Sequence, residues 1–295
     1  MLFQRIIRAF WALALLIIAG QPAAADEAAV ARGAYLVRAG GCVACHTTPK
    51  GGQPFAGGRA MATPFGTFYT PNITPDPDTG IGNWSDADFL RALRDGVSPA
   101  GEHYFPVFPY TSYTQMTQAD ALAIKAYLFS LPPVIAPRKA HAVGFPFSWR
   151  MLQTGWKLMF FRDGAFKPRP GRDQMVNRGA YLVRGLGHCG ECHTPRSPLG
   201  GALIGLALAG TKDGPDGEKV PNITPDRETG IGKWSAAEIA ELLKSGTKPD
   251  FDNVQGSMAE VVDDGTSHLT DEDRLAIATY LLSLPPVRHG NPVSN

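Results

Sequence analysis

The sequence lacks several features that would point to common classes of protein. Its 28 Lys and Arg are balanced by 27 Asp and Glu, and a net charge of +1 offers no basic surface for nucleic acid. It contains no Gly-rich phosphate loop, no flavin or molybdenum motif, and no pairing of a nucleophile with a base. After residue 20, no apolar run is long enough to span a bilayer. These absences argue against nucleic-acid binding and against catalysis within the chain.

Cysteine is also scarce, and its placement is the strongest signal. The 295 residues include only 4 cysteines, all within two C-x-x-C-H units. In this pattern two thiols bond to the vinyl groups of one porphyrin, and the adjoining His ligates the iron. A thioredoxin-like pair or half of a zinc site also uses C-x-x-C, but two complete units with no cysteine left over favour haem. We predict two covalently bound haem c groups, attached through Cys42, Cys45, Cys189 and Cys192, with the axial ligands His46 and His193.

The haem motif belongs to a longer internal repeat. Residues 32–38 return as 178–184, residues 71–85 return as 221–235 with three changes, and residues 122–134 are matched by 275–287. The offset grows along the chain, so the second copy carries small insertions. We therefore predict two homologous domains. Their ranges are 26–136 and 172–290, followed by a tail of residues 291–295.

Each copy predicts short helices separated by long loops. Residues 28–39 predict a helix that leads into the first haem motif. Serines at 85 and 235, each followed three positions later by an acid, predict capping boxes, and Thr117 and Thr270 open the last helices. Paired prolines end those last helices. The expected fold is mainly α, and it resembles two tandem class I cytochrome c domains joined by an aromatic-rich linker.

The first 25 residues predict a signal peptide. Arg5 and Arg8 precede an apolar run at residues 9–20, and the alanines at 23–25 offer a cleavage site. The run is shorter than the ~20 residues needed to cross a bilayer, which favours cleavage over a retained anchor. We expect a periplasmic protein, with association at the outer face of the inner membrane as a further expectation.

The linker, residues 137–171, is unusually rich in aromatic residues and methionine. It includes Phe145, Phe147, Trp149, Trp156 and Phe160. A linker that only crossed water would be polar. We expect it to pack across both domains and fix their orientation. The alternative is that part of its surface docks on a partner subunit or on the membrane surface.

The sixth iron ligand decides whether each haem carries electrons or binds a substrate. In the second copy only Met258 lies between the middle and last helices, so it is the expected ligand. Counted from the matched tryptophan, the same position in the first copy is Phe108, which cannot bind iron. Met116 is the expected ligand there, and Met61, His103 or an open site are the alternatives.

Taken together, these blocks resemble a known family. The R-G-A-Y-L-V-R, C-x-x-C-H-T, P-N-I-T-P-D and S-L-P-P-V blocks and the aromatic linker are similar to the cytochrome c subunits of bacterial membrane-associated dehydrogenases of the alcohol and gluconate type. The resemblance covers nearly all of the mature chain. Those subunits usually carry three haem domains rather than two, and they often have methionine at the position of Phe108.

The resemblance implies an electron-transfer subunit rather than an enzyme. Such a subunit takes electrons from a catalytic dehydrogenase subunit and passes them into the respiratory chain, to quinone or a terminal oxidase. The alternative is a haem enzyme, such as a di-haem peroxidase or a thiosulfate-oxidising cytochrome. That alternative requires one iron with an exchangeable ligand.

Overall fold

The computed structural model describes residues 21–290 of the chain. Residues 1–20, which hold most of the predicted signal peptide, and the tail at 291–295 lie outside the described residues. Within residues 21–290, no helix is both long enough and apolar enough to cross a membrane.

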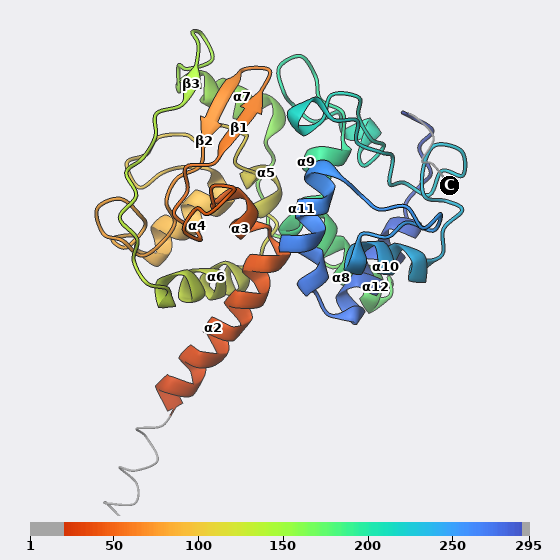
Figure 1. The fold of residues 1–295 in the computed structure, drawn as a ribbon, viewed down its shortest axis with the longest axis horizontal. Coiled ribbons are helices and arrows are strands. Elements are labelled where there is room, and N and C mark those ends of the chain that lie inside the picture. The colour runs from red at the N-terminus through yellow and green to blue at the C-terminus, as the bar shows by residue number, and fades with distance from the viewer. Residues whose placement is uncertain (1–20, 291–295) are drawn as a thin grey trace, which may run out of the picture.

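Residues 21–290 form helices joined by long loops and one small sheet (Figure 1). The first half, residues 21–136, contains α2 (Gln21–Ala39), α3 (Cys42–Cys45), β1 (Ala60–Thr63), β2 (Gly66–Tyr69), α4 (Asp86–Asp95), α5 (Tyr110–Tyr113) and α6 (Gln118–Ser130). The connecting segment contains β3 (Ala142–Val143) and α7 (Leu152–Phe160). The second half, residues 172–290, contains α8 (Gln174–Tyr181), a π-helical turn (Leu182–Leu186), α9 (Gly190–His193), the 3-10 turns Ile204–Leu206 and Pro215–Gly217, α10 (Ala236–Ser245), α11 (Gly256–Asp264), the 3-10 turn Thr266–His268 and α12 (Asp271–Leu282).

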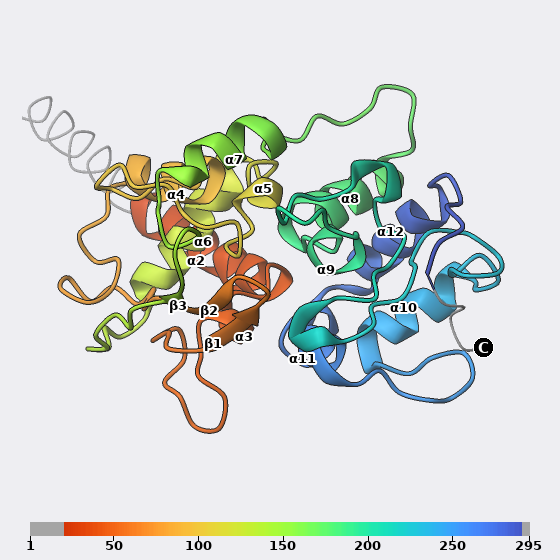
Figure 2. The same ribbon diagram turned by 90° about the horizontal axis from the view of Figure 1, so that it is seen from above.

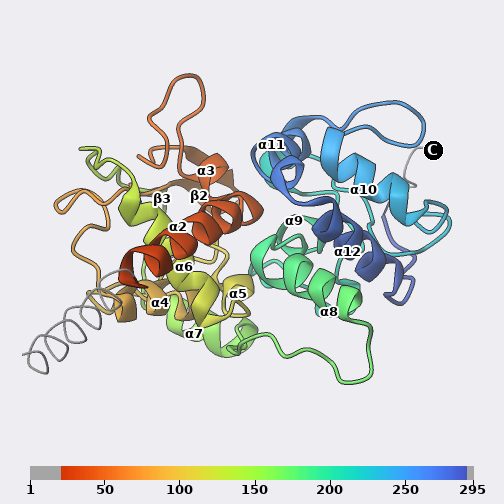
Figure 3. The same ribbon diagram turned by 90° about the horizontal axis from the view of Figure 1, so that it is seen from below.

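The two halves repeat one packing arrangement. In the first, α2 crosses α6 and α4 packs on α6, and in the second, α8 crosses α12 and α10 packs on α12. Gly33 and Gly179 permit these crossings. A Cβ atom at either position would lie 1.9 Å from a carbonyl oxygen of the facing helix, that of Ala123 or Ala276. Figures 2 and 3 show the halves side by side, with the segment after α7 passing from one to the other along one edge.

The predicted capping boxes are confirmed at the middle helices. The Ser85 Oγ accepts the backbone N–H of Asp88 at 3.1 Å, and the Asp88 carboxylate accepts the N–H of Ser85 at 3.2 Å. Ser235 and Glu238 repeat the arrangement before α10. Thr117 caps α6 and Thr270 caps α12, as the sequence predicts. The helix α2 already includes Gln21, so it extends further toward the N-terminus than the predicted residue 28.

The connecting segment adds structure that the sequence did not predict. Its strand β3 extends the antiparallel hairpin of β1 and β2 to an antiparallel three-stranded sheet. The Lys157 ammonium on α7 donates to the carbonyl oxygen of Gly96 in the first half, at 2.9 Å. The Trp156 indole N–H donates to the carbonyl oxygen of Leu199 in the second half, also at 2.9 Å. The segment therefore contacts both halves.

Candidate haem-binding sites

The first C-x-x-C-H motif lies directly after α2. The chain turns at Gly40 and Gly41, α3 carries both cysteines, and His46 follows as the C-terminal cap of α3. The His46 Nδ1 lies 2.8 Å from the carbonyl oxygen of Pro71. A carbonyl oxygen only accepts, so the ring hydrogen is on Nδ1 and the lone pair is on Nε2. The imidazole is therefore held in the tautomer that ligates iron.

The second motif reproduces this geometry. The π-helical turn leads into α9, and the His193 Nδ1 lies 2.8 Å from the carbonyl oxygen of Pro221. Burial lowers the pKa of both motif histidines, although their bonds to the proline carbonyls act in the opposite direction. Both imidazoles are therefore neutral near pH 7. Neutral His is the form that binds a metal.

The four cysteine thiols are free. Burial, with a smaller contribution from the C-x-x-C partner, raises the pKa of Cys42 and of Cys189 to about 12. A thioredoxin-like pair needs the opposite shift, because the thiolate is the reactive form. The thiols and histidines therefore fit covalent haem better than thiol redox chemistry.

A buried asparagine follows each of the two prolines. In the first half the Asn72 Nδ2 donates to the carbonyl oxygen of Val134 at 2.7 Å, and its Oδ1 accepts the N–H of Thr74 at 2.9 Å. Asn222 makes the same bonds in the second half, at 2.7 and 2.8 Å. In each half, the P-N-I-T and S-L-P-P-V blocks thus form a hydrogen-bond network beside the proline carbonyl that orients the motif histidine. The sequence showed that these blocks repeat, but their role needed the structure.

Met258, the predicted ligand of the second iron, lies in the first turn of α11. Its side chain is partly buried and packs against the core. The start of this helix is tightly defined. Gly256 has φ of +58°, and a Cβ there would lie 2.0 Å from the Glu218 carboxylate, which also accepts the N–H of Ser257 at 3.2 Å. These contacts fix the position of the first turn of α11, which carries Met258.

The candidates for the first iron lie on three different segments. Met116 is 1% exposed and sits just before α6, while Met61 is partly exposed on β1, and His103 is partly exposed in the loop after α4. Phe108 packs edge to face on Tyr113, with ring centroids 5.8 Å apart. Met116, the expected ligand, is more buried than the alternatives Met61 and His103.

Comparison with known proteins identifies the family of this chain. The profile of the cytochrome c family matches residues 30–132. A diheme c-type cytochrome of Cereibacter sphaeroides is 46% identical over 266 residues, which cover 87% of this chain and 86% of that protein. This chain belongs to the cytochrome c family.

Other relatives of this cytochrome are subunits of dehydrogenases. The gluconate 2-dehydrogenase cytochrome c subunit of Pantoea cypripedii is 43% identical over 268 residues, 88% of this chain and 60% of that subunit. The cytochrome c subunit of the alcohol dehydrogenase (quinone) of Gluconobacter oxydans is 39% identical over 281 residues, 90% of this chain and 57% of that subunit. The chain thus spans about 60% of the length of these subunits. Its similarity is to cytochrome subunits, which are electron-transfer components and not catalytic subunits.

Proposed function

We propose that this chain is a periplasmic di-haem cytochrome c. Each half, residues 26–136 and 172–290, is a class I cytochrome c-like domain with one haem, and residues 137–171 link them. The observation that carries the proposal is the duplicated proximal side. Each half has two free thiols and a histidine whose Nδ1 lies 2.8 Å from a proline carbonyl oxygen. The bound haem iron would carry one electron at a time.

On the distal side we propose Met258 for the second iron and Met116 for the first. A methionine thioether raises the reduction potential and closes the iron to other molecules. Two closed irons suit an electron carrier. An open first iron would instead favour the alternative, a haem enzyme such as a peroxidase.

We propose a catalytic dehydrogenase subunit as the electron donor and quinone or a terminal oxidase as the acceptor. The relatives named as dehydrogenase subunits support the donor. Co-purification of the native complex tests this, because the donor would be recovered with the cytochrome. Recovery of the chain alone under mild extraction would count against a permanent subunit.

We further propose that the connecting segment rests on the outer face of the inner membrane. Several of its large apolar side chains are exposed, among them Phe145, Phe147, Trp149, Met151, Leu158 and Met159. Residues 137–171 also contain seven Lys or Arg and one Asp, in a chain of net charge +1. Exposed aromatics beside basic residues are typical of proteins bound to anionic lipid surfaces. Co-sedimentation should be stronger with phosphatidylglycerol vesicles than with phosphatidylcholine vesicles, and weaker at high salt.

Haem counting tests the core of the proposal. The wild-type chain should contain two covalently bound haems in a pyridine haemochrome assay. Replacing Cys42 and Cys45 by Ala should remove one haem, and the matched change at Cys189 and Cys192 should remove the other. An absorption band of Met–Fe(III) type from both haems, unchanged by cyanide or peroxide, supports a carrier. A high-spin component that reacts with peroxide would overturn that assignment for the iron concerned.

A further inference from the structure

The repeated R-G-A-Y block places a tyrosine seven or eight residues before the first cysteine of each haem motif. Its arginine and glycine act within their own half. Arg32 on α2 pairs with Asp120 on α6, and Arg178 on α8 pairs with Asp273 on α12. The tyrosine of each block instead reaches into the other half.

The first crossing contact joins α2 to α12. The Tyr35 hydroxyl donates to the Asp273 Oδ2 at 2.6 Å and accepts the backbone N–H of Thr270 at 3.3 Å. Asp273 is buried, and it also receives two hydrogen bonds from the Arg178 guanidinium, at 2.8 and 2.6 Å. Burial alone would raise the pKa of this carboxyl, but the bonds from Arg178 and Tyr35 hold it below its ordinary value. The acceptor is therefore charged at neutral pH, and hydrogen bonds to charged groups are the stronger kind.

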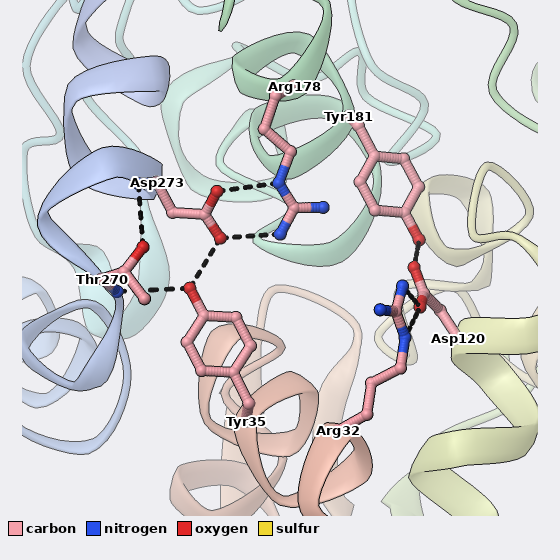
Figure 4. Close-up of polar contacts among 7 residues, drawn as sticks. All are labelled: Arg32, Tyr35, Asp120, Arg178, Tyr181, Thr270 and Asp273. Carbon is pink, nitrogen blue, oxygen red and sulfur yellow. Dashed lines mark hydrogen bonds and ion pairs between the residues drawn. The ribbon is translucent and has the colours of Figure 1, made fainter. Parts of the chain in front are cut away.

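The second crossing contact is the counterpart of the first (Figure 4). The Tyr181 hydroxyl of α8 donates to the Asp120 Oδ2 of α6 at 2.5 Å and accepts the backbone N–H of Thr117 at 3.4 Å. Arg32 holds the same carboxylate, with its Nε donating at 2.7 Å. Asp120 is 2% exposed and Tyr181 is 6% exposed. The two contacts are related by an approximate two-fold axis, since equivalent residues of the repeat exchange places.

Each tyrosine completes a helix cap that the other half leaves unfinished. At α4 and α10 the acid at the third helical position reaches back to the N–H of the capping serine. At α6 and α12 the side chain of the capping threonine accepts the backbone N–H of the acid, as in a capping box. The acid's carboxylate does not reach the threonine N–H directly; a tyrosine hydroxyl from the opposite half bridges them, accepting the threonine N–H and donating to the carboxylate. Docking of the halves thus supplies a hydrogen-bond acceptor to the backbone N–H of Thr117 and of Thr270, which would otherwise have no partner within their own helix.

Docking also brings the haem-attachment segments into contact. The carbonyl oxygen of Gly40, two residues before Cys42, accepts the Tyr113 hydroxyl at 2.9 Å and lies 3.3 Å from the His188 Nε2 of the second half. His188 directly precedes the second motif. Glu191, inside that motif, accepts the Ser112 hydroxyl of the first half at 2.7 Å.

A further contact between the first haem motif and the second half runs through Arg59 of the first half. Its guanidinium donates to the carbonyl oxygen of Ala44, inside the first motif, at 2.9 Å and to the Glu260 carboxylate at 2.6 Å. Glu260 lies on α11, two residues after Met258. Each haem-attachment segment is therefore bound to the other half of the molecule.

We propose that Tyr35 and Tyr181 are positioning residues that hold the two haem-attachment segments against each other, so that the two haems exchange electrons within the molecule. Electron exchange weakens steeply as the gap between two haems widens, so the docking geometry controls its rate. The inference rests on the proposed function, since it assumes one haem in each half.

The test compares Tyr35→Phe, Tyr181→Phe and the double variant as haem-loaded full-length proteins. Each change removes one hydroxyl and keeps the ring. Tyr127→Phe is the matched control, because Tyr127 packs on Phe55 inside the first half, with ring centroids 6.2 Å apart. Haem content, measured first, confirms that each variant is loaded and folded.

Hydrogen exchange gives a readout that does not depend on electron transfer. Tyr35→Phe should speed exchange at the Thr270 amide about tenfold, and Tyr181→Phe should do the same at Thr117, each in the half opposite to the change. In the double variant, pulsed EPR should show a broader iron–iron distance distribution. Flash photolysis should show electron exchange between the haems slowed at least tenfold, while Tyr127→Phe leaves all three measurements unchanged.

Two other results have distinct meanings. A double variant with wild-type amide exchange, distance distribution and electron-exchange rate would overturn the role of the tyrosines. A wild-type protein that binds two haems but shows no electron exchange between them would overturn the positioning inference and the carrier function together. The amide measurement would still show whether the tyrosines dock the halves.

Discussion

Replacing Asn222 by alanine should destabilise the second half strongly. This side chain is 1% exposed. Its Nδ2 donates to the carbonyl oxygen of Val287 at 2.7 Å and to the Thr229 hydroxyl at 3.0 Å, and its Oδ1 accepts the N–H and the hydroxyl of Thr224, each at 2.8 Å. Alanine removes these four bonds, together with a longer one of 3.4 Å to the carbonyl oxygen of His289, and leaves buried partners unsatisfied.

The expected size follows from those four bonds. At about 1 kcal/mol for each hydrogen bond, the free energy of unfolding should fall by about 4 kcal/mol. With a guanidinium m value on the order of 4 kcal/mol/M, the unfolding midpoint of the second half should move down by about 1 M. Guanidinium unfolding of the haem-loaded protein, followed by circular dichroism and by the Soret band, measures this shift.

Asn83→Ala is the matched control. Asn83 is exposed, and its Nδ2 donates to the carbonyl oxygen of Pro77 at 2.8 Å. Its loss should cost under about 0.5 kcal/mol, as is usual for surface positions. Asn72→Ala should repeat the large effect in the first half, since the same network is present there. If Asn222→Ala cost no more than Asn83→Ala, the reasoning about the network would be refuted.

Three further changes test the two iron sites and their boundary. Met258→Ala should lower the potential of the second haem and open its iron to cyanide, and an unaltered absorption spectrum would rule this residue out as the ligand. Met116→Ala should do the same at the first haem, whereas a spectrum that keeps two Met–Fe(III) bands would exclude Met116. Glu191→Gln should lower the free energy of unfolding at pH 7 by about 1–2 kcal/mol. It should also weaken the dependence of that free energy on pH in the acidic range. Burial opposes the Glu191 charge, but Arg196 and two hydroxyl donors hold the pKa of this carboxyl below its ordinary value. Its contribution is therefore complete above the unfolded pKa of about 4.3 and is lost as pH falls through the lower folded value, which acid unfolding of both proteins measures.

The sheet and α7 show which parts of the fold escaped prediction. Strands β1 and β2 have four residues each and β3 has two, too few for a period of two to stand out. The strand β3 forms only because the connecting segment returns to the first half, which no local pattern encodes. The capping boxes at Ser85 and Ser235 were predictable because both partners lie within four residues of each other.

The residues of the candidate haem sites also fall into those that local spacing predicts and those that only the fold brings into place. The cysteines and the histidine of each motif occupy one helical turn, so their spacing alone indicates a shared porphyrin. The oxygen that orients His46 belongs to Pro71, 25 residues further on, and only folding brings it within 2.8 Å. The proposed distal ligands lie on segments whose course depends on packing, so counting along the chain could not choose among Met116, Met61 and His103.

The sequence by itself therefore determined the chemistry of attachment and the existence of two copies, because both are written in local spacing and in repetition. The tertiary structure decided how the copies face each other. Tyr35 lies 238 positions before Asp273 along the chain, yet its hydroxyl bonds to that carboxylate. A repeat shows that the same residues recur, but the partner of a side chain is selected by the packing of distant helices.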